Sequence, residues 1–124
     1  MATTEDVVSA IDADQKDALA RLFELLAIPS VSAVPAHVPD CEKAADWLVA
    51  QLVDLGFEAS KQPTAGKPIV VGRVSAKRRE APHVLFYGHY DVQPVDPLSL
   101  WTSPPFEPRL AAGPNGHWAV QLHT

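Results

Sequence analysis

The sequence predicts an α/β fold in which two helices are followed by strands. Two stretches repeat apolar residues at helical spacing, and three later segments read as extended and are separated by turns that contain proline and glycine. The last of these segments is continuously apolar from Val84 to Tyr87, which is typical of a strand covered on both faces. With 124 residues, 47% hydrophobic and 20% charged, the chain is expected to fold as a single unit.

The first helix is predicted from about Glu5 to Ala27. Its apolar stripe is interrupted between Asp12 and Asp17, and it consists of Val8, Ile11, Ala18, Leu19, Leu22, Phe23 and Leu26. The loop IPSVSAVPAHVPD ends this helix, because its three prolines prevent the helix from continuing.

The second helix is predicted to begin at Asp40, a plausible N-cap, and to end near Gly56. One face of this helix carries Ala44, Leu48, Gln51, Leu52 and Leu55. Gly56 suits the left-handed position after a helix, with Phe57 packing back on Leu52. Cys41 is the only cysteine, so no intrachain disulfide can form; we interpret it as a small buried residue and expect a cytoplasmic location.

The extended segments are FEASKQ, IVVGRVSA and HVLFYGH. A further hairpin is predicted near the end of the sequence, with PNG as the turn between RLAA and HWAV.

Charge and hydropathy argue against two classes of partner. The net charge of −5 opposes binding to nucleic acid, which depends largely on Lys and Arg at the phosphates. The opening MATTEDVV is acidic where a signal peptide is basic, and no apolar run approaches the roughly 18 residues of a membrane span. We therefore expect neither a nucleic-acid partner nor a membrane partner.

The chemistry is concentrated where the third extended segment ends. The stretch HVLFYGHYDVQPV turns at Gly88 and presents His89 and Asp91 two residues apart, on the same side of an extended backbone. Ligands of open α/β sheets bind beyond the carboxyl ends of strands. A metal-binding His often donates its second N–H to a carboxylate, and Asp91 suits that role. A hydrogen-bonded start of a loop explains the same residues, so both interpretations stay open.

GHYDVQPV, followed by LWTSPPFEP, resembles the zinc-dependent exopeptidases and deacylases, a family that includes carnosinase-like dipeptidases, aminoacylase, acetylornithine deacetylase and carboxypeptidase G-type enzymes. The form of the motif is most similar to the dipeptidase branch. The resemblance extends upstream through LARLFELLAIPSVSA and EKAADWLVAQLVDLGFEA, and so covers the chain to about Arg109.

The resemblance implies that His89 is a ligand of one of two zinc ions and that Asp91 is the catalytic-site carboxylate that orients it. The substrate implied is a small peptide or an N-acyl amino acid. In that family the zinc pair polarises the scissile carbonyl and activates a water whose proton a glutamate takes. The fold implied is the N-terminal portion of a catalytic domain, two helices followed by strands of a mixed sheet.

The sequence departs from the family after FEPRL. From Pro108 to Thr124 it contains no Asp or Glu, although the family's bridging Asp is expected to follow the hairpin. We therefore expect residues 1–124 to be one partial domain without the lid or dimerisation domain, and to be inactive alone. Two alternatives remain: a noncatalytic binding or regulatory module of the same fold, and a small zinc domain that uses His89, His117 and His123.

Overall fold

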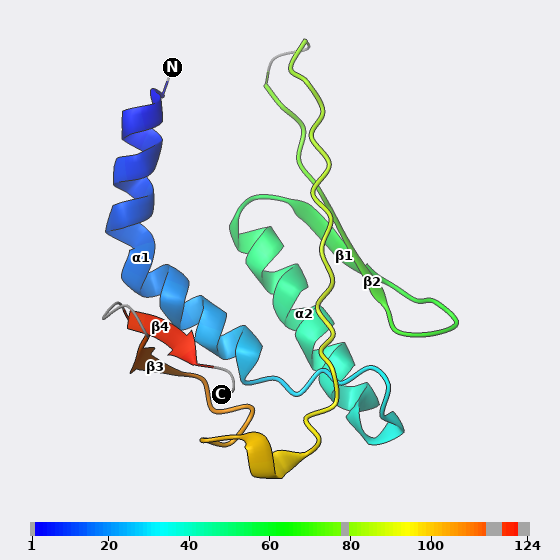
Figure 1. Ribbon diagram of the computed structural model, residues 1–124. Helices are drawn as coiled ribbons and strands as arrows, with labels where there is room; N and C mark the ends of the chain where they lie inside the picture. Colours follow the sequence, from blue (N-terminus) through cyan, green and yellow to red (C-terminus); the bar gives the residue numbers. More distant parts are fainter. Residues whose placement is uncertain (1, 78–79, 114–117, 122–124) are drawn as a thin grey trace. The chain divides into compact units, whose positions relative to one another are not determined.

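The computed structural model describes residues 2–77, 80–113 and 118–121, and it divides the chain into two compact units. One unit is Ile28–Asp96, and the other combines Met1–Ala27 with Pro97–Thr124. Two long helices precede the strands, as the sequence predicts, and the described strands form two antiparallel pairs (Figure 1).

Helix α1 spans Thr4–Leu26, close to its predicted range. A capping box starts it: the backbone N–H of Asp6 donates to the Thr3 hydroxyl (3.2 Å), and the N–H of Thr3 donates to Asp6 Oδ2 (2.8 Å). The acidic interruption of the stripe does not break the helix, and Arg21 forms an ion pair with Asp14 along its surface. None of the residues of α1 is buried.

Helix α2 spans Val38–Asp54 and follows a short 3-10 helix, η1, at Pro35–His37. The predicted N-cap was wrong, because His37 and not Asp40 occupies that position. The η1 turn runs directly into α2 with Pro39 in the first turn, where its missing N–H costs no hydrogen bond. Asp40 instead lies in that turn and contacts His37, with 2.7 Å between Oδ2 and Nδ1.

The end of α2 confirms the predicted glycine cap. Gly56 adopts a φ of 86°, in the left-handed region that favours glycine. Its N–H donates to the carbonyl of Val53 (2.8 Å), and the N–H of Phe57 donates to the carbonyl of Leu52 (2.9 Å). These two bonds are those of a Schellman motif, so the chain reverses sharply into the next strand.

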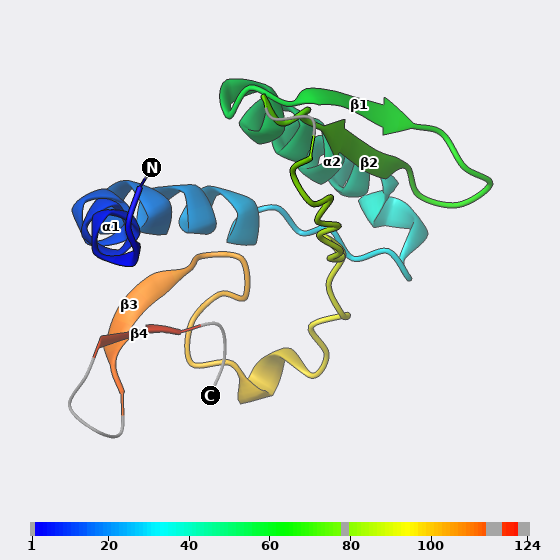
Figure 2. The same cartoon turned by 90° about the horizontal axis from the view of Figure 1, so that it is seen from above.

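Strands β1 (Glu58–Gln62) and β2 (Ile69–Arg73) form an antiparallel hairpin in the first two predicted extended segments. Both strands contact α2 (Figure 2). A Cβ added at Gly72 would lie 2.9 Å from Leu52 Cδ1, so the lack of a side chain there permits this close approach. Lys61 on β1 reaches back to α2, where its Nζ lies 2.7 Å from Glu42 and 2.6 Å from Asp46.

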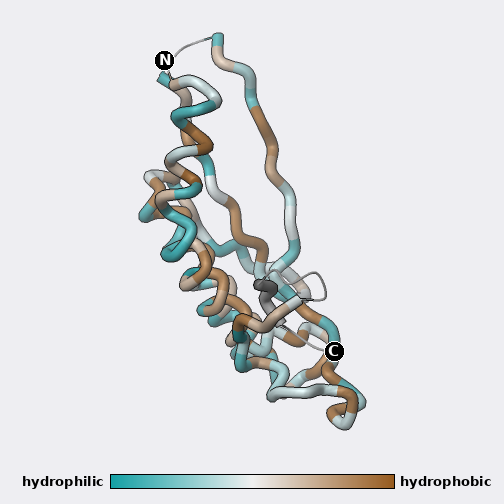
Figure 3. The backbone as a smooth tube through the Cα atoms, turned by 60° about the vertical axis from the view of Figure 1, so that its left-hand side comes forward, coloured by the Kyte–Doolittle hydropathy of each residue, from teal (hydrophilic) through white to brown (hydrophobic). Residues whose placement is uncertain are grey.

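The third extended segment differs from its prediction. Among the residues that the structure describes, no strand pairs with Val84–Tyr87, and these four residues are 70%, 92%, 90% and 92% exposed. The hydropathy colouring follows this apolar stretch along the extended chain (Figure 3). A continuous apolar run indicates a strand that can be buried on both faces. The run does not show which elements bury it, because those elements are distant in sequence.

The second unit contains the other strand pair. A 3-10 helix, η2 (Leu98–Leu100), precedes β3 (Arg109–Ala112), which pairs antiparallel with β4 (Trp118–Gln121). This confirms the two strands predicted near the end of the sequence. The predicted PNG turn between them lies outside the described residues.

The fully buried residues of the described chain lie in the unit Ile28–Asp96. They are Ile28, Ser30 and Val31, directly after α1, Cys41, Ala44 and Ala45 on α2, and Pro68 just before β2. Cys41 is 0% exposed, as predicted, and burial raises the pKa of its thiol. No helix in the described part of the chain is both long enough and apolar enough to cross a membrane.

Candidate functional site

His89 and Asp91 lie on the extended chain after Gly88, within the unit Ile28–Asp96. An isolated parallel bridge between Val92 and Val31 follows directly and attaches this segment to the loop after α1. His89 is exposed, with 77% of its side chain accessible, whereas Asp91 is half-buried. The two side chains predicted to act together therefore differ in how firmly their surroundings hold them.

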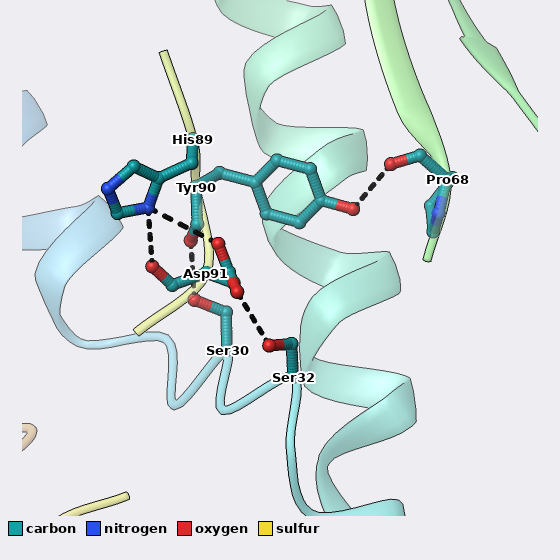
Figure 4. Close-up of polar contacts among 6 residues, drawn as sticks. All are labelled: Ser30, Ser32, Pro68, His89, Tyr90 and Asp91. Atoms are coloured by element: carbon teal, nitrogen blue, oxygen red, sulfur yellow. Dashed lines mark hydrogen bonds and ion pairs between the residues drawn. The ribbon is translucent and has the colours of Figure 1, made fainter. Parts of the chain in front are cut away.

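The structure brings the predicted pair into contact (Figure 4). His89 Nδ1 lies 3.2 Å from Asp91 Oδ1 and 3.0 Å from the backbone carbonyl oxygen of Asp91. A carbonyl oxygen only accepts, so this second contact is a hydrogen bond only if Nδ1 carries the proton. In the neutral ring the lone pair is then on Nε2, the nitrogen through which such a His can bind a metal.

Two serines that sequence reasoning missed support Asp91 and its neighbours. The Ser32 hydroxyl donates to Asp91 Oδ2 (2.5 Å), and this hydrogen bond is the main reason that the pKa of Asp91 is lowered. The Ser30 hydroxyl donates to the carbonyl of Tyr90 (2.7 Å). A carboxylate held ionised in this way is a good acceptor for the N–H of His89.

Tyr90 turns the opposite way from His89 (Figure 4). Its hydroxyl donates to the carbonyl of Pro68, just before β2, at 2.7 Å. Partial burial raises the pKa of this phenol, so it remains a neutral donor at physiological pH. Tyr90 thus anchors the segment between the two predicted functional residues.

The other histidines do not join this pair in the described structure. His37 pairs with Asp40, and His83 is exposed on the extended segment. His117 and His123, which the alternative small zinc domain requires, lie outside the described residues.

Comparison with known proteins identifies related enzymes, although no family model matches the chain. A cysteinylglycine-S-conjugate dipeptidase of Corynebacterium striatum is 35% identical over 86 residues, which are 69% of this chain and 19% of that protein. The Cys-Gly metallodipeptidase DUG1 of Candida albicans is 38% identical over 102 residues, covering 69% of this chain and 20% of the relative. A succinyl-diaminopimelate desuccinylase of Thiobacillus denitrificans is 38% identical over 112 residues, covering 90% and 25%.

The fold gives the same result. The solved structure of the dipeptidase Dug1p from Saccharomyces cerevisiae matches with a TM-score of 0.70 and 27% identity, over 83% of this chain and 23% of that one. The chain belongs to this family of metallodipeptidases and deacylases. The resemblance to the dipeptidase branch is therefore confirmed, and the chain spans about a fifth of the length of the dipeptidases it matches.

The residues present fit the family's metal only in part. His89 suits one ligand position, because its Nδ1 faces Asp91 and its ring is largely exposed. A catalytic zinc usually takes three protein ligands, and no group of three His, Cys, Asp or Glu residues suited to a metal occurs in the part of the chain that the structure describes. The described residues therefore offer one candidate ligand position with a carboxylate partner, and not a complete centre.

Proposed function

We propose that this chain contributes His89 as one ligand of a di-zinc centre in a metallopeptidase that hydrolyses dipeptides or N-acyl amino acids. The observation that carries the proposal is the contact of His89 Nδ1 with Asp91, which leaves Nε2 as the ligating nitrogen. The names of the relatives, Cys-Gly dipeptidases and desuccinylases, support this class of substrate.

In this proposal the chain's own residues bind and orient. Asp91 receives the Nδ1 proton of His89 in a hydrogen bond, which sets the ring's tautomer and raises the basicity of Nε2. Ser32 keeps the Asp91 carboxylate in place and ionised. The metal pair supplies polarisation of the scissile carbonyl and a nucleophilic water at neutral pH when bound.

Residues 1–124 are not expected to catalyse the reaction alone. The described residues offer one recognisable ligand position and not the set of three that a catalytic zinc usually takes. Loss of general acid–base participation also typically lowers the rate by about 10²–10⁴-fold. Turnover of a dipeptide panel should therefore fall far below the ordinary range of about 1–10³ s⁻¹, with zinc or manganese added. Turnover within that range that disappears in His89→Ala would show that the missing ligands come from residues not recognised here.

A zinc titration followed by ¹⁵N NMR of the imidazole rings tests the ligand itself. His83, exposed on the same extended segment, is the matched control. We expect zinc to bind at His89 about 10-fold more tightly than at His83, because a carboxylate partner typically contributes about 10–100-fold to metal affinity. Asp91→Asn should bring His89 to the level of His83. Equal affinity at the two rings in the unmodified chain would reject the ligand role and favour a noncatalytic module.

A further inference from the structure

The loop Ile28–Ser32 is more deeply buried than its position between two helices requires. Ile28, Ser30 and Val31 are 4%, 2% and 2% exposed. The sequence pattern gives this loop no role except to end α1. Polar groups at such depth are nearly always hydrogen-bonded. The partners of its two serines therefore indicate what the loop holds.

Ser30 holds the backbone on both sides of Asp91. Its hydroxyl donates to the carbonyl of Tyr90 at 2.7 Å, and its own carbonyl accepts from the N–H of Val92 at 3.0 Å. The Val31–Val92 bridge lies beside these bonds. Asp91 is therefore fixed at a backbone position whose two neighbours are both tied to one buried residue.

Ser32 holds the side chain of the same residue. Its hydroxyl donates to Asp91 Oδ2 at 2.5 Å, while the second carboxylate oxygen, Oδ1, lies 3.2 Å from His89 Nδ1 (Figure 4). A carboxylate bound through one oxygen cannot rotate freely, so the direction of the other oxygen is set as well. One carboxylate oxygen of Asp91 thus contacts Ser32 in the loop and the other contacts the exposed imidazole of His89.

We propose that Ser32 is a positioning residue that, through Asp91, sets the orientation and tautomer of the His89 ring, with Ser30 holding the backbone that carries them. The inference deepens the proposed function, and its consequence for metal binding rests on that function. The positioning itself is a property of the metal-free chain. It is therefore measurable whether or not a metal binds.

The test compares Ser32→Val with Ser32→Thr, two variants of nearly equal shape of which only threonine keeps the hydroxyl. The readout is the ratio of the two neutral tautomers of His89, from long-range ¹H–¹⁵N spectra of the metal-free chain at a pH where the ring is uncharged. In the unmodified chain the Nδ1–H tautomer should predominate. Ser32→Val should lower the ratio of Nδ1–H to Nε2–H by about 2- to 12-fold, the equilibrium equivalent of one net hydrogen bond. Ser32→Thr should restore it.

The expected change is partial because the backbone carbonyl of Asp91 also accepts from Nδ1, at 3.0 Å. Ser60→Ala serves as the control, since Ser60 is exposed on β1 and its hydroxyl accepts a hydrogen bond from the side-chain amide of Gln62, two residues away. A tautomer ratio that is the same in Ser32→Val and Ser32→Thr overturns the proposal. So does an equal shift in Ser60→Ala.

Adding zinc to the same samples separates this inference from the proposed function. Loss of the Ser32 hydroxyl should weaken zinc binding at His89 by about 10-fold, the lower range for outer hydrogen-bond partners of a ligand. If zinc does not bind His89 in the unmodified chain while the tautomer still responds to Ser32, the positioning role stands and the ligand role fails. If zinc binds but the tautomer ignores Ser32, the reverse holds.

Discussion

Replacing Leu85 with lysine is expected to reduce self-association of the 124-residue chain. Leu85 is 92% exposed in an apolar run, Val84–Tyr87, that forms no strand pair among the described residues. Such a run offers unpaired backbone groups and apolar side chains to a second copy, which is how exposed strand edges aggregate. We therefore expect the unmodified chain to form oligomers that increase with concentration.

The magnitude follows from the exposure. Because Leu85 is almost fully accessible, covering it in an intermolecular contact gains about 1.5–3 kcal/mol, and that gain is lost with lysine. Each 1.4 kcal/mol is a factor of ten, so association should weaken by about 10- to 150-fold. The lysine charge also opposes edge-to-edge pairing.

Sedimentation velocity over a wide range of concentrations measures the effect. Leu55→Lys is the matched control, because Leu55 is also a solvent-exposed leucine (73%) but sits at the end of α2, outside the apolar run. A monodisperse monomer at all concentrations, with a sharp cooperative melt, would contradict the prediction and favour a self-sufficient module. An equal effect of Leu55→Lys would show that general hydrophobicity, and not the run, drives association.

Two further predictions concern the ends of the helices. Gly56→Ala should lower the free energy of unfolding of the unit Ile28–Asp96 by about 1–2 kcal/mol in chemical denaturation, because alanine is strained at a φ of 86°. Gly66→Ala is the control: its added Cβ would make only an ordinary contact, so it should change the free energy of unfolding far less. Hydrogen bonds from Thr3 lower the pKa of Asp6, so their stabilisation of α1 is complete above the ordinary value of 3.8 and is lost as the pH falls through the lower folded value. Amide protection in the first turn of α1 should accordingly not change with pH above 3.8 and should be lost as the pH falls below it. Thr3→Ala removes the hydroxyl but keeps the backbone N–H, which is the larger cause, so this variant should return the pKa of Asp6 only part of the way to its ordinary value. An Asp6 titration that does not change at all in this variant would show that the Thr3 hydroxyl has no part in lowering the pKa.

Local patterns predicted the helices, the glycine cap, the extended segments of β1 and β2, and the strands of the later hairpin, because each depends on residues close in sequence. The N-cap of α2 was misassigned since Asp40 has the right chemistry, but the preceding η1 turn and Pro39 start the helix earlier. The cover of Val84–Tyr87 was not predictable, because burial depends on distant partners rather than on the apolar run.

The candidate site shows the same division. Spacing predicted that His89 and Asp91 would face the same way, and the structure places them in contact. Their metal role remains a prediction. Ser30 and Ser32 were missed because they are about sixty residues away in sequence, and no periodicity connects a loop after one helix to a segment that far along. Two hydroxyl side chains in a loop between helices were the only feature of the sequence that could have pointed to these residues.

The alternation along residues 89–91 determines which changes of length the site can tolerate. His89 and Asp91 face one side, while Tyr90 faces the other and is anchored to Pro68 (Figure 4). Because side-chain direction in an extended chain has a period of two, an insertion of one residue between Asp91 and the bridged Val92 would exchange these faces, turning the imidazole inward and the phenol outward. An insertion of two residues would keep the faces. Related sequences can therefore differ in length in this segment by an even number of residues but not by an odd number, in addition to any limit on residue type.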